Sequence, residues 1–232
     1  AGGLILRIDQ PYGRRFDEEL SDTEPKRKYY IACEGKKTEY QYFKGLLEAR
    51  NELGISSLIE VIPIKHTQGT NSHPLTIIKE THEVIGNCEV FSPDLDTVCI
   101  LVDRDAKNFL SHQFDKAVTL CQLYNFRFVV SNPCMEIWLL FHFTDLTAYD
   151  KQAILENTKT GDRTMTEIVL KNDFLHGSYN KTRIHFTRDF LPHVWTAIKN
   201  ARKYSLAIDE LKNSLGTNIG LLVKEILSQE WI

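Results

Sequence analysis

Three carboxylates follow two apolar stretches of the chain. Glu34 comes directly after residues 29–33, and Asp103 and Asp105 follow residues 97–102. In an open α/β sheet, side chains just beyond the carboxyl ends of neighbouring strands converge on one crevice, so residues far apart in sequence can meet there. Hard oxygen ligands of this number suit Mg²⁺ or Mn²⁺. The sequence therefore predicts a metal site formed by Glu34, Asp103 and Asp105.

The predicted metal site has a chemical use. Carboxylates crowded together disfavour ionisation unless a cation neutralises them. Divalent ions held in this way serve phosphoryl transfer, one activating water and another stabilising the leaving oxygen. An Asp-x-Asp pair alone is also typical of a solvated strand end or turn. The presence of both acidic signatures, each after an apolar stretch, favours the metal site.

Two further glutamates are candidate catalytic residues, each with a structural alternative. Glu39 is either an additional ligand or general base, or a residue that only stabilises the first turn of a helix. Glu136, near the start of a helix predicted from Pro133, either faces the crevice or stabilises that helix in the same way. His142 lies among apolar and aromatic residues, which is typical of a hydrogen-bonded core histidine.

Cations near an acidic site would give an anionic substrate something to bind. Tyr179 and Trp195 could stack on bases, although isolated aromatic residues at helical spacing more often belong to a core. The net charge of −3 and the pI near 6.3 exclude a protein that coats nucleic acid through charge alone, so any such contact must be local. We expect substrate contacts from four cations: Lys37, Lys65, Lys181 and Arg183.

Apolar stretches alternate with helical patterns along the first two thirds of the chain. We expect strands at 28–33, 58–64, 97–102 and 126–130, with helices from 38, 74, 114 and 133. This alternation predicts βαβ units and a mainly parallel sheet, that is, an α/β Rossmann-like core over residues 28–143. Residues 1–27 show no sustained period and are interpreted as an N-terminal arm.

Residues 144–232 contain no convincing strand. They are interpreted as a helical C-terminal region packed on the core, with the longest helix at 185–204 and another after 216. No apolar stretch reaches the roughly 18 residues of a membrane span, and we expect no membrane association. Five cysteines without a CxxC pair predict buried thiols in a reducing cytosol, hence a cytoplasmic protein.

Other nucleotide chemistries do not fit. The chain has no GxGxxG after its first predicted strand, so a dinucleotide-dependent oxidoreductase is set aside. It also lacks a Walker A motif, so any ATP hydrolysis linked to this protein must belong to a partner protein.

Three motifs together resemble the RloB family, Toprim-related proteins of bacterial anti-phage defence. They are Glu34-Gly35-x-x-Thr38-Glu39, Asp103-x-Asp105, and the stretch 131–143, which reads Ser-Asn-Pro-Cys-Met-Glu-Ile-Trp-Leu-Leu-Phe-His-Phe. The resemblance extends from Lys28 nearly to the end of the chain, through Tyr179-x-Lys181 and Thr217-Asn218 among other pieces.

This resemblance implies a Toprim-type fold, in which the Glu and the Asp-x-Asp hold Mg²⁺ for cleaving or joining nucleic-acid phosphodiesters. It also implies an ABC-like, RloA-type ATPase partner that senses or regulates. One departure concerns substrate geometry: many Toprim proteins have Gly shortly after Asp-x-Asp, whereas Ala106-Lys107-Asn108 follows here.

Two functions follow. The first is a Mg²⁺- or Mn²⁺-dependent nuclease acting on RNA or DNA in phage defence, regulated by the ATPase. The alternative is a non-catalytic Toprim-like subunit that binds a metal or nucleotide and switches the ATPase. A homo-oligomer is compatible with both.

Overall fold

The computed structural model describes residues 27–33, 38–56, 59–64 and 73–228. The predicted arm, apart from Arg27, lies outside these residues, as do Glu34, Lys37 and Lys65. Within the described residues, no helix combines the length and the apolar character needed to cross a membrane.

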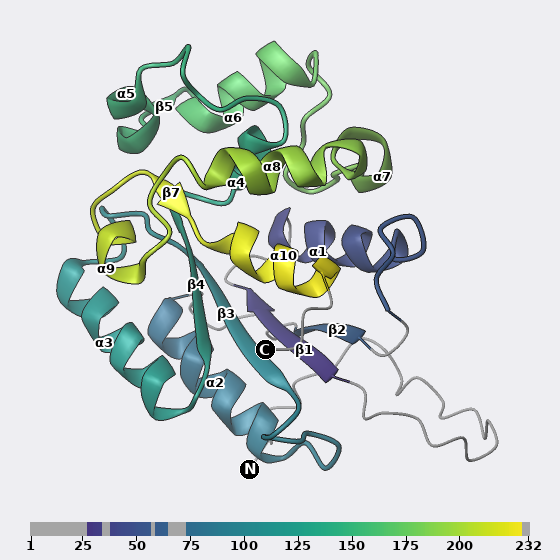
Figure 1. Cartoon of the computed structure of the whole chain (residues 1–232). Coiled ribbons are helices and arrows are strands. Elements are labelled where there is room, and N and C mark those ends of the chain that lie inside the picture. The colour runs from purple at the N-terminus through teal and green to yellow at the C-terminus, as the bar shows by residue number, and fades with distance from the viewer. Residues whose placement is uncertain (1–26, 34–37, 57–58, 65–72, 229–232) are drawn as a thin grey trace.

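A five-stranded sheet forms the centre of the molecule (Figure 1). Its strand order is β2 (Ile59–Ile64), β1 (Arg27–Cys33), β3 (Thr97–Asp103), β4 (Arg127–Asn132) and β7 (Gly216–Thr217). The first four strands are mutually parallel, and β7 pairs antiparallel with β4. The predicted α/β class with a mainly parallel sheet is confirmed.

Helices cover both faces of the sheet. Helices α2 (Pro74–Gly86) and α3 (Ser111–Leu123) lie on one face, and α1 (Thr38–Glu48) and α10 (Ile219–Ser228) lie on the other (Figure 1). Strands β1, β3 and β4 are apolar on both sides, since alternate residues of each enter two separate hydrophobic clusters. This explains why the buried parallel strands read in the sequence as continuous apolar runs.

The chain after β4, which comprises α4 and the C-terminal region, adds short elements to the sheet (Figure 1), and its main helices pack into the same hydrophobic cluster as α1. In chain order these elements are α4 (Glu136–Phe141), α5 (Lys151–Glu156), β5 (Lys159–Thr160), β6 (Arg163–Thr164), α6 (Met165–Val169), a π-helical turn (Leu170–Phe174), α7 (Phe186–Asp189), a 3-10 turn (Leu191–His193), α8 (Val194–Ala201) and α9 (Ile208–Leu211).

Two expectations for this region were wrong. The described part of the C-terminal region contains three short strands, and one of them, β7, joins the central sheet. The helix predicted at 185–204 is interrupted after Asp189, where Pro192 lies in the 3-10 turn and cannot donate a backbone hydrogen bond. Gly216 in β7 has a steric role, because a side chain there would collide with the carbonyl of Ser205.

Buried polar side chains fasten the C-terminal region to β4. Asn218 accepts the Val130 amide at 2.7 Å and donates to the Phe128 carbonyl at 3.2 Å. Ser131 and Thr217 share a hydrogen bond of 2.9 Å between their hydroxyls. The motif Thr217-Asn218 therefore holds the end of β4 in place. The following helix α4 begins at Glu136, three residues later than expected, because a turn around Pro133 intervenes.

Candidate functional site

The carboxyl ends of β1, β3 and β4 lie side by side because these parallel strands are in register. Cys33, the last residue of β1, pairs with Leu101, and Asp103, the last residue of β3, pairs with Ser131. Side chains alternate along a strand, so Asp103 lies on the same face as Leu101, which packs in the cluster beneath α1 and α4. The fold thus places an acid at the sheet edge where those two helices begin.

Asp103 is held by the connection between β4 and α4. Its Oδ1 accepts a hydrogen bond from the Met135 backbone amide at 2.8 Å. Met135 is the residue directly before α4, so the turn around Pro133 positions this amide. The contact orients a half-buried carboxylate without supplying an opposing charge.

Asp105 has a different environment. It is exposed, and its Oδ1 accepts the Lys107 amide at 3.1 Å while its Oδ2 accepts from the Asn108 side chain at 2.6 Å. These contacts close the turn after β3, which is the structural role that an Asp commonly takes in such positions.

Arg104, between the two acids, faces the opposite side of the sheet. Only 2% of it is exposed. Its guanidinium donates to the carbonyls of Lys212 at 2.8 Å and Phe109 at 2.5 Å, and it lies 5.2 Å from the centre of the Phe114 ring. Sequence reasoning missed this residue. The available signal was a cation at the position where strand alternation calls for an apolar side chain.

Three glutamates, Glu39, Glu136 and Glu167, gather around Lys181 and are called the carboxylate cluster below. Lys181 bridges two of them, with its Nζ 3.1 Å from Glu136 Oε1 and 2.6 Å from Glu167 Oε1. Tyr179 donates its hydroxyl to Glu136 Oε1 at 2.9 Å. Glu136 and Glu39 are only 2% and 8% exposed, so the cluster is largely shielded from water.

Burial and mutual repulsion change the ionisation of this cluster. The pKa of Glu39 is raised, chiefly by burial and further by the charge of Glu136. Burial alone would lower the pKa of Lys181, but the charges of Glu136 and Glu167 outweigh it and the pKa is raised. Lys181 therefore stays protonated, while Glu39 is a carboxyl group that binds its proton more tightly than a solvated one.

Two buried thiols lie close both to Asp103 and to a glutamate of the carboxylate cluster. Burial raises the pKa of Cys33, and the charges of Glu39 and Asp103 raise it further. Burial likewise raises the pKa of Cys134, which lies within the field of Glu136 and Asp103. Each thiol thus lies close to Asp103 and to one glutamate. The fold brings Asp103, Glu39 and Glu136 to one edge of the sheet.

The carboxylates at this edge have the right chemistry for a divalent metal ion. Carboxylate oxygens are the ligands that Mg²⁺ and Mn²⁺ prefer, so the residue types fit. Within the described residues, however, no three His, Cys, Asp or Glu side chains are arranged to hold a metal ion. A site built on Asp103 and Asp105 therefore requires a further ligand, and the sequence offers Glu34, which lies outside the described residues.

The remaining predicted residues take varied positions. Arg183 is exposed, two residues beyond Lys181. Tyr179 is buried and holds Glu136, so it is not a base-stacking surface, whereas Trp195 is 56% exposed. His142 is the core histidine expected: it contacts the Tyr42 hydroxyl at 3.1 Å and the Trp138 carbonyl at 3.0 Å, and burial lowers its pKa to about 3.

Glu167 was not anticipated from the sequence. It lies on the five-residue helix α6 and pairs with Lys181. No motif or period marks it, and the contact depends entirely on how α6 packs near α4.

The fold and the edge geometry define an α/β protein with acids gathered at the carboxyl ends of a mainly parallel sheet. Comparison with family models gives a match to the RloB family, described as RloB-like protein, over residues 29–226. The chain belongs to this family. Neither the curated proteins nor the solved structures that were searched gave a match.

Proposed function

We propose that this chain is a divalent-metal-dependent nuclease that cleaves phosphodiesters in RNA or DNA during anti-phage defence. Its main support is the excess of acids over cations among the described residues of the carboxyl edge, where Asp103 and the carboxylate cluster gather and Glu136 and Glu167 share Lys181. Burying like charges together is costly unless something neutralises them, and a divalent cation would do so. Membership of the RloB-like family supports the same function.

In this proposal the acids have three different roles: metal binding, proton exchange and orientation of Lys181. Asp103 and Asp105 together with Glu34 would hold Mg²⁺ or Mn²⁺, and the bound ion would supply a Lewis acid and neutralise phosphate charge. Glu39 exchanges a proton, since burial raises its pKa above that of a solvated glutamate. Glu136 orients Lys181 through their ion pair.

The cations of the proposal contact the substrate. Lys181 and Arg183 bind phosphate oxygens beside the carboxylate cluster, and Lys37 and Lys65 do so from outside the described residues. An ABC-like ATPase of the RloA type is the proposed regulator of this activity.

The test is cleavage of total RNA, single-stranded DNA and plasmid in Mg²⁺ and in Mn²⁺, with and without the ATPase. The variant Asp103→Asn keeps an oxygen for the Met135 amide but removes the charge. Asp94→Asn is the matched control, because Asp94 is an exposed acid just before β3, at the opposite edge of the sheet. We expect metal-dependent cleavage that Asp103→Asn abolishes and Asp94→Asn preserves. Equal cleavage by Asp103→Asn and the wild type would show that the site is wrong.

The second candidate function is a non-catalytic subunit that binds a metal or nucleotide and switches the ATPase. It is favoured by Asp105, whose carboxylate oxygens both accept hydrogen bonds within its own turn. Absence of cleavage in every condition, together with a stable ATPase complex that survives Asp103→Asn, would favour this function over the nuclease.

A further inference from the structure

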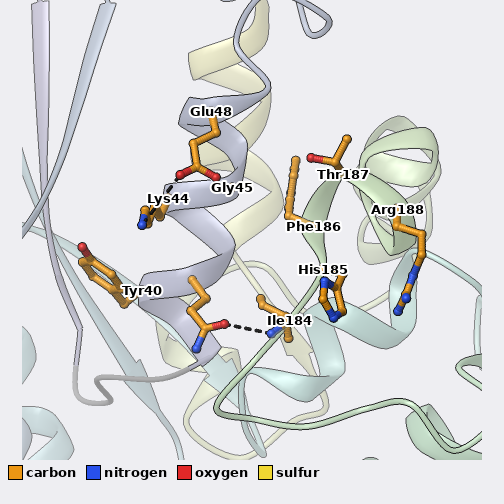
Figure 2. Close-up of a pocket in the computed structure, with 10 residues that line it drawn as sticks. Tyr40, Lys44, Gly45, Glu48, Ile184, His185, Phe186, Thr187 and Arg188 are labelled. Atoms are coloured by element: carbon orange, nitrogen blue, oxygen red, sulfur yellow. Dashed lines mark hydrogen bonds and ion pairs between the residues drawn. The ribbon is translucent and has the colours of Figure 1, made fainter.

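A pocket of about 450 Å³ lies between α1 and residues 184–188. Figure 2 shows α1 on one side and the segment from Ile184 to Arg188 on the other. On α1 the lining side chains recur every four residues, at Tyr40, Lys44 and Glu48, so they belong to one helix face. The volume is in the range of pockets that hold small ligands, which begins at about 300 Å³.

The pocket adjoins the carboxylate cluster through the same two chain segments. Gln41 accepts the Ile184 amide at 2.8 Å and donates to the Thr182 carbonyl. Thr38, next to Glu39, donates to the Lys181 carbonyl at 3.5 Å. Helix α1 has Glu39 at its start and lines the pocket further along. In the same way, the segment that begins with Lys181 lines the pocket from Ile184 onward.

The side chains of the pocket suit a nucleotide. Lys44 and Arg188 are exposed cations, and His185 and Thr187 add further polar groups. Arg188 uses its Nε and Nη2 for Asp189, at 2.6 and 2.9 Å, but a guanidinium has five N–H donors.

One acid, Glu48, and one aromatic residue, Tyr40, also line the pocket. Glu48 lies 3.7 Å from Lys44 in an exposed pair, which is weak enough for a phosphate to compete with. Tyr40 supplies a half-buried aromatic ring. Aromatic rings with flexible cations are the usual means of binding single strands without sequence preference.

We propose that this pocket binds a nucleotide of a single-stranded nucleic acid next to the phosphodiester at the carboxylate cluster. The inference rests on the proposed nuclease function for what happens at the cluster, but the binding itself does not require cleavage. Lys44 and Arg188 contact phosphates and Tyr40 stacks on a base. A duplex would present paired bases that cannot enter, so single strands are preferred.

Binding is measured by fluorescence anisotropy in EDTA, with a labelled uridine or thymidine oligomer of about ten nucleotides. The variant Lys44→Ala/Arg188→Ala is expected to bind about tenfold more weakly, because charged contacts are lost. The slope of log affinity against log salt should fall by about 1.4, or about 0.7 for each lost contact. Tyr40→Leu should also weaken binding about tenfold but leave the slope unchanged.

The matched control is Lys79→Ala/Lys116→Ala, which removes two exposed cations from α2 and α3 on the other face of the sheet. It should bind as the wild type does. The proposal is overturned if Lys44→Ala/Arg188→Ala keeps wild-type affinity and slope, if the wild type does not bind the oligomers, or if a duplex of the same length binds more tightly.

These outcomes are separate from those of the cleavage assay. Binding that depends on the pocket, in a protein that never cleaves, would support this inference and contradict the nuclease. Cleavage that depends on Asp103, together with binding that is unchanged when Lys44, Arg188 and Tyr40 are replaced, would support the nuclease and contradict this inference.

Discussion

The two edges of the central sheet each hold a glutamate that accepts from a tyrosine and faces a cation. At the amino edge, Glu225 accepts from the Tyr29 hydroxyl at 2.7 Å and from Arg127 at 2.6 Å. At the carboxyl edge, Glu136 accepts from a tyrosine at 2.9 Å and pairs with Lys181 at 3.1 Å. The same three kinds of group therefore recur at opposite ends of the strands.

The balance of charge distinguishes these two edges. Glu225 has two arginines, Arg127 and the more distant Arg27 at 3.8 Å, for one carboxylate. Burial raises the pKa of Glu225, but its hydrogen bonds outweigh burial and the pKa is lowered. At the carboxyl edge Lys181 pairs with two glutamates, and Glu39 has a raised pKa beside them. Among the residues that the structure describes, the amino edge is balanced, whereas the carboxyl edge holds more acids than cations, which favours a cationic ligand.

Removal of one cation from each edge should have unequal effects. Lys181→Met leaves the almost fully buried Glu136 without its ion pair, and we expect the free energy of unfolding to fall by about 2 kcal/mol. This loss is smaller than that for breaking a fully buried ion pair, because Lys181 is partly exposed. Arg27→Met should cost less than about 1 kcal/mol, since Glu225 keeps Arg127. Urea denaturation at pH 7 measures both. Equal losses would contradict the difference in charge balance.

Neutralising the glutamate of the amino edge should destabilise the protein. Because the pKa of Glu225 is lowered on folding, its contribution is present above the unfolded pKa near 4.3 and is lost as the pH falls through the folded value. Glu225→Gln should therefore lower the free energy of unfolding by about 1.5 kcal/mol at pH 7. Denaturation at a series of pH values should show the difference from wild type shrinking in acid. A difference that persists at low pH would indicate lost packing instead.

The same change at the carboxyl edge should act in the opposite direction. The pKa of Glu39 is raised on folding, so its ionisation costs stability as the pH rises through the unfolded value towards the folded one. Glu39→Gln should therefore stabilise the protein, by about 1 kcal/mol at pH 7. The thermal midpoint would rise while any metal-dependent cleavage falls. Destabilisation by Glu39→Gln would show that its charge is already compensated within the fold.

The sequence predicted the central sheet because buried parallel strands are long apolar runs. The strand expected at 97–102 is β3, Thr97–Asp103, and the one expected at 126–130 is β4, Arg127–Asn132. The two-residue strand β7 is too short to show a period, and its pairing depends on the side chain of Asn218 and on Gly216. Such short elements are set by tertiary contacts that sequence patterns do not contain.

The candidate site was predictable where a residue lies at the end of an element. Asp103 at the end of β3 and Glu136 at the start of α4 lie at the carboxyl edge because strand direction determines their location. The role of Glu167 was not predictable, since it depends on how α6 packs. For Arg104 the pattern marks an unusual cation, but its partner, the Lys212 carbonyl, is distant in sequence and was not predictable. Assignment of Asp103 and Asp105 as metal ligands stays a prediction.

The most direct test of the acid excess is a titration with Mn²⁺ at pH 7.5, followed by electron paramagnetic resonance of the free ion. We expect the wild type and Asp94→Asn to bind Mn²⁺ alike, and Asp103→Asn to bind at least about tenfold more weakly because a hard anionic ligand is lost. Equal binding by Asp103→Asn and the wild type, or no binding by the wild type, would contradict a cation site at the carboxyl edge.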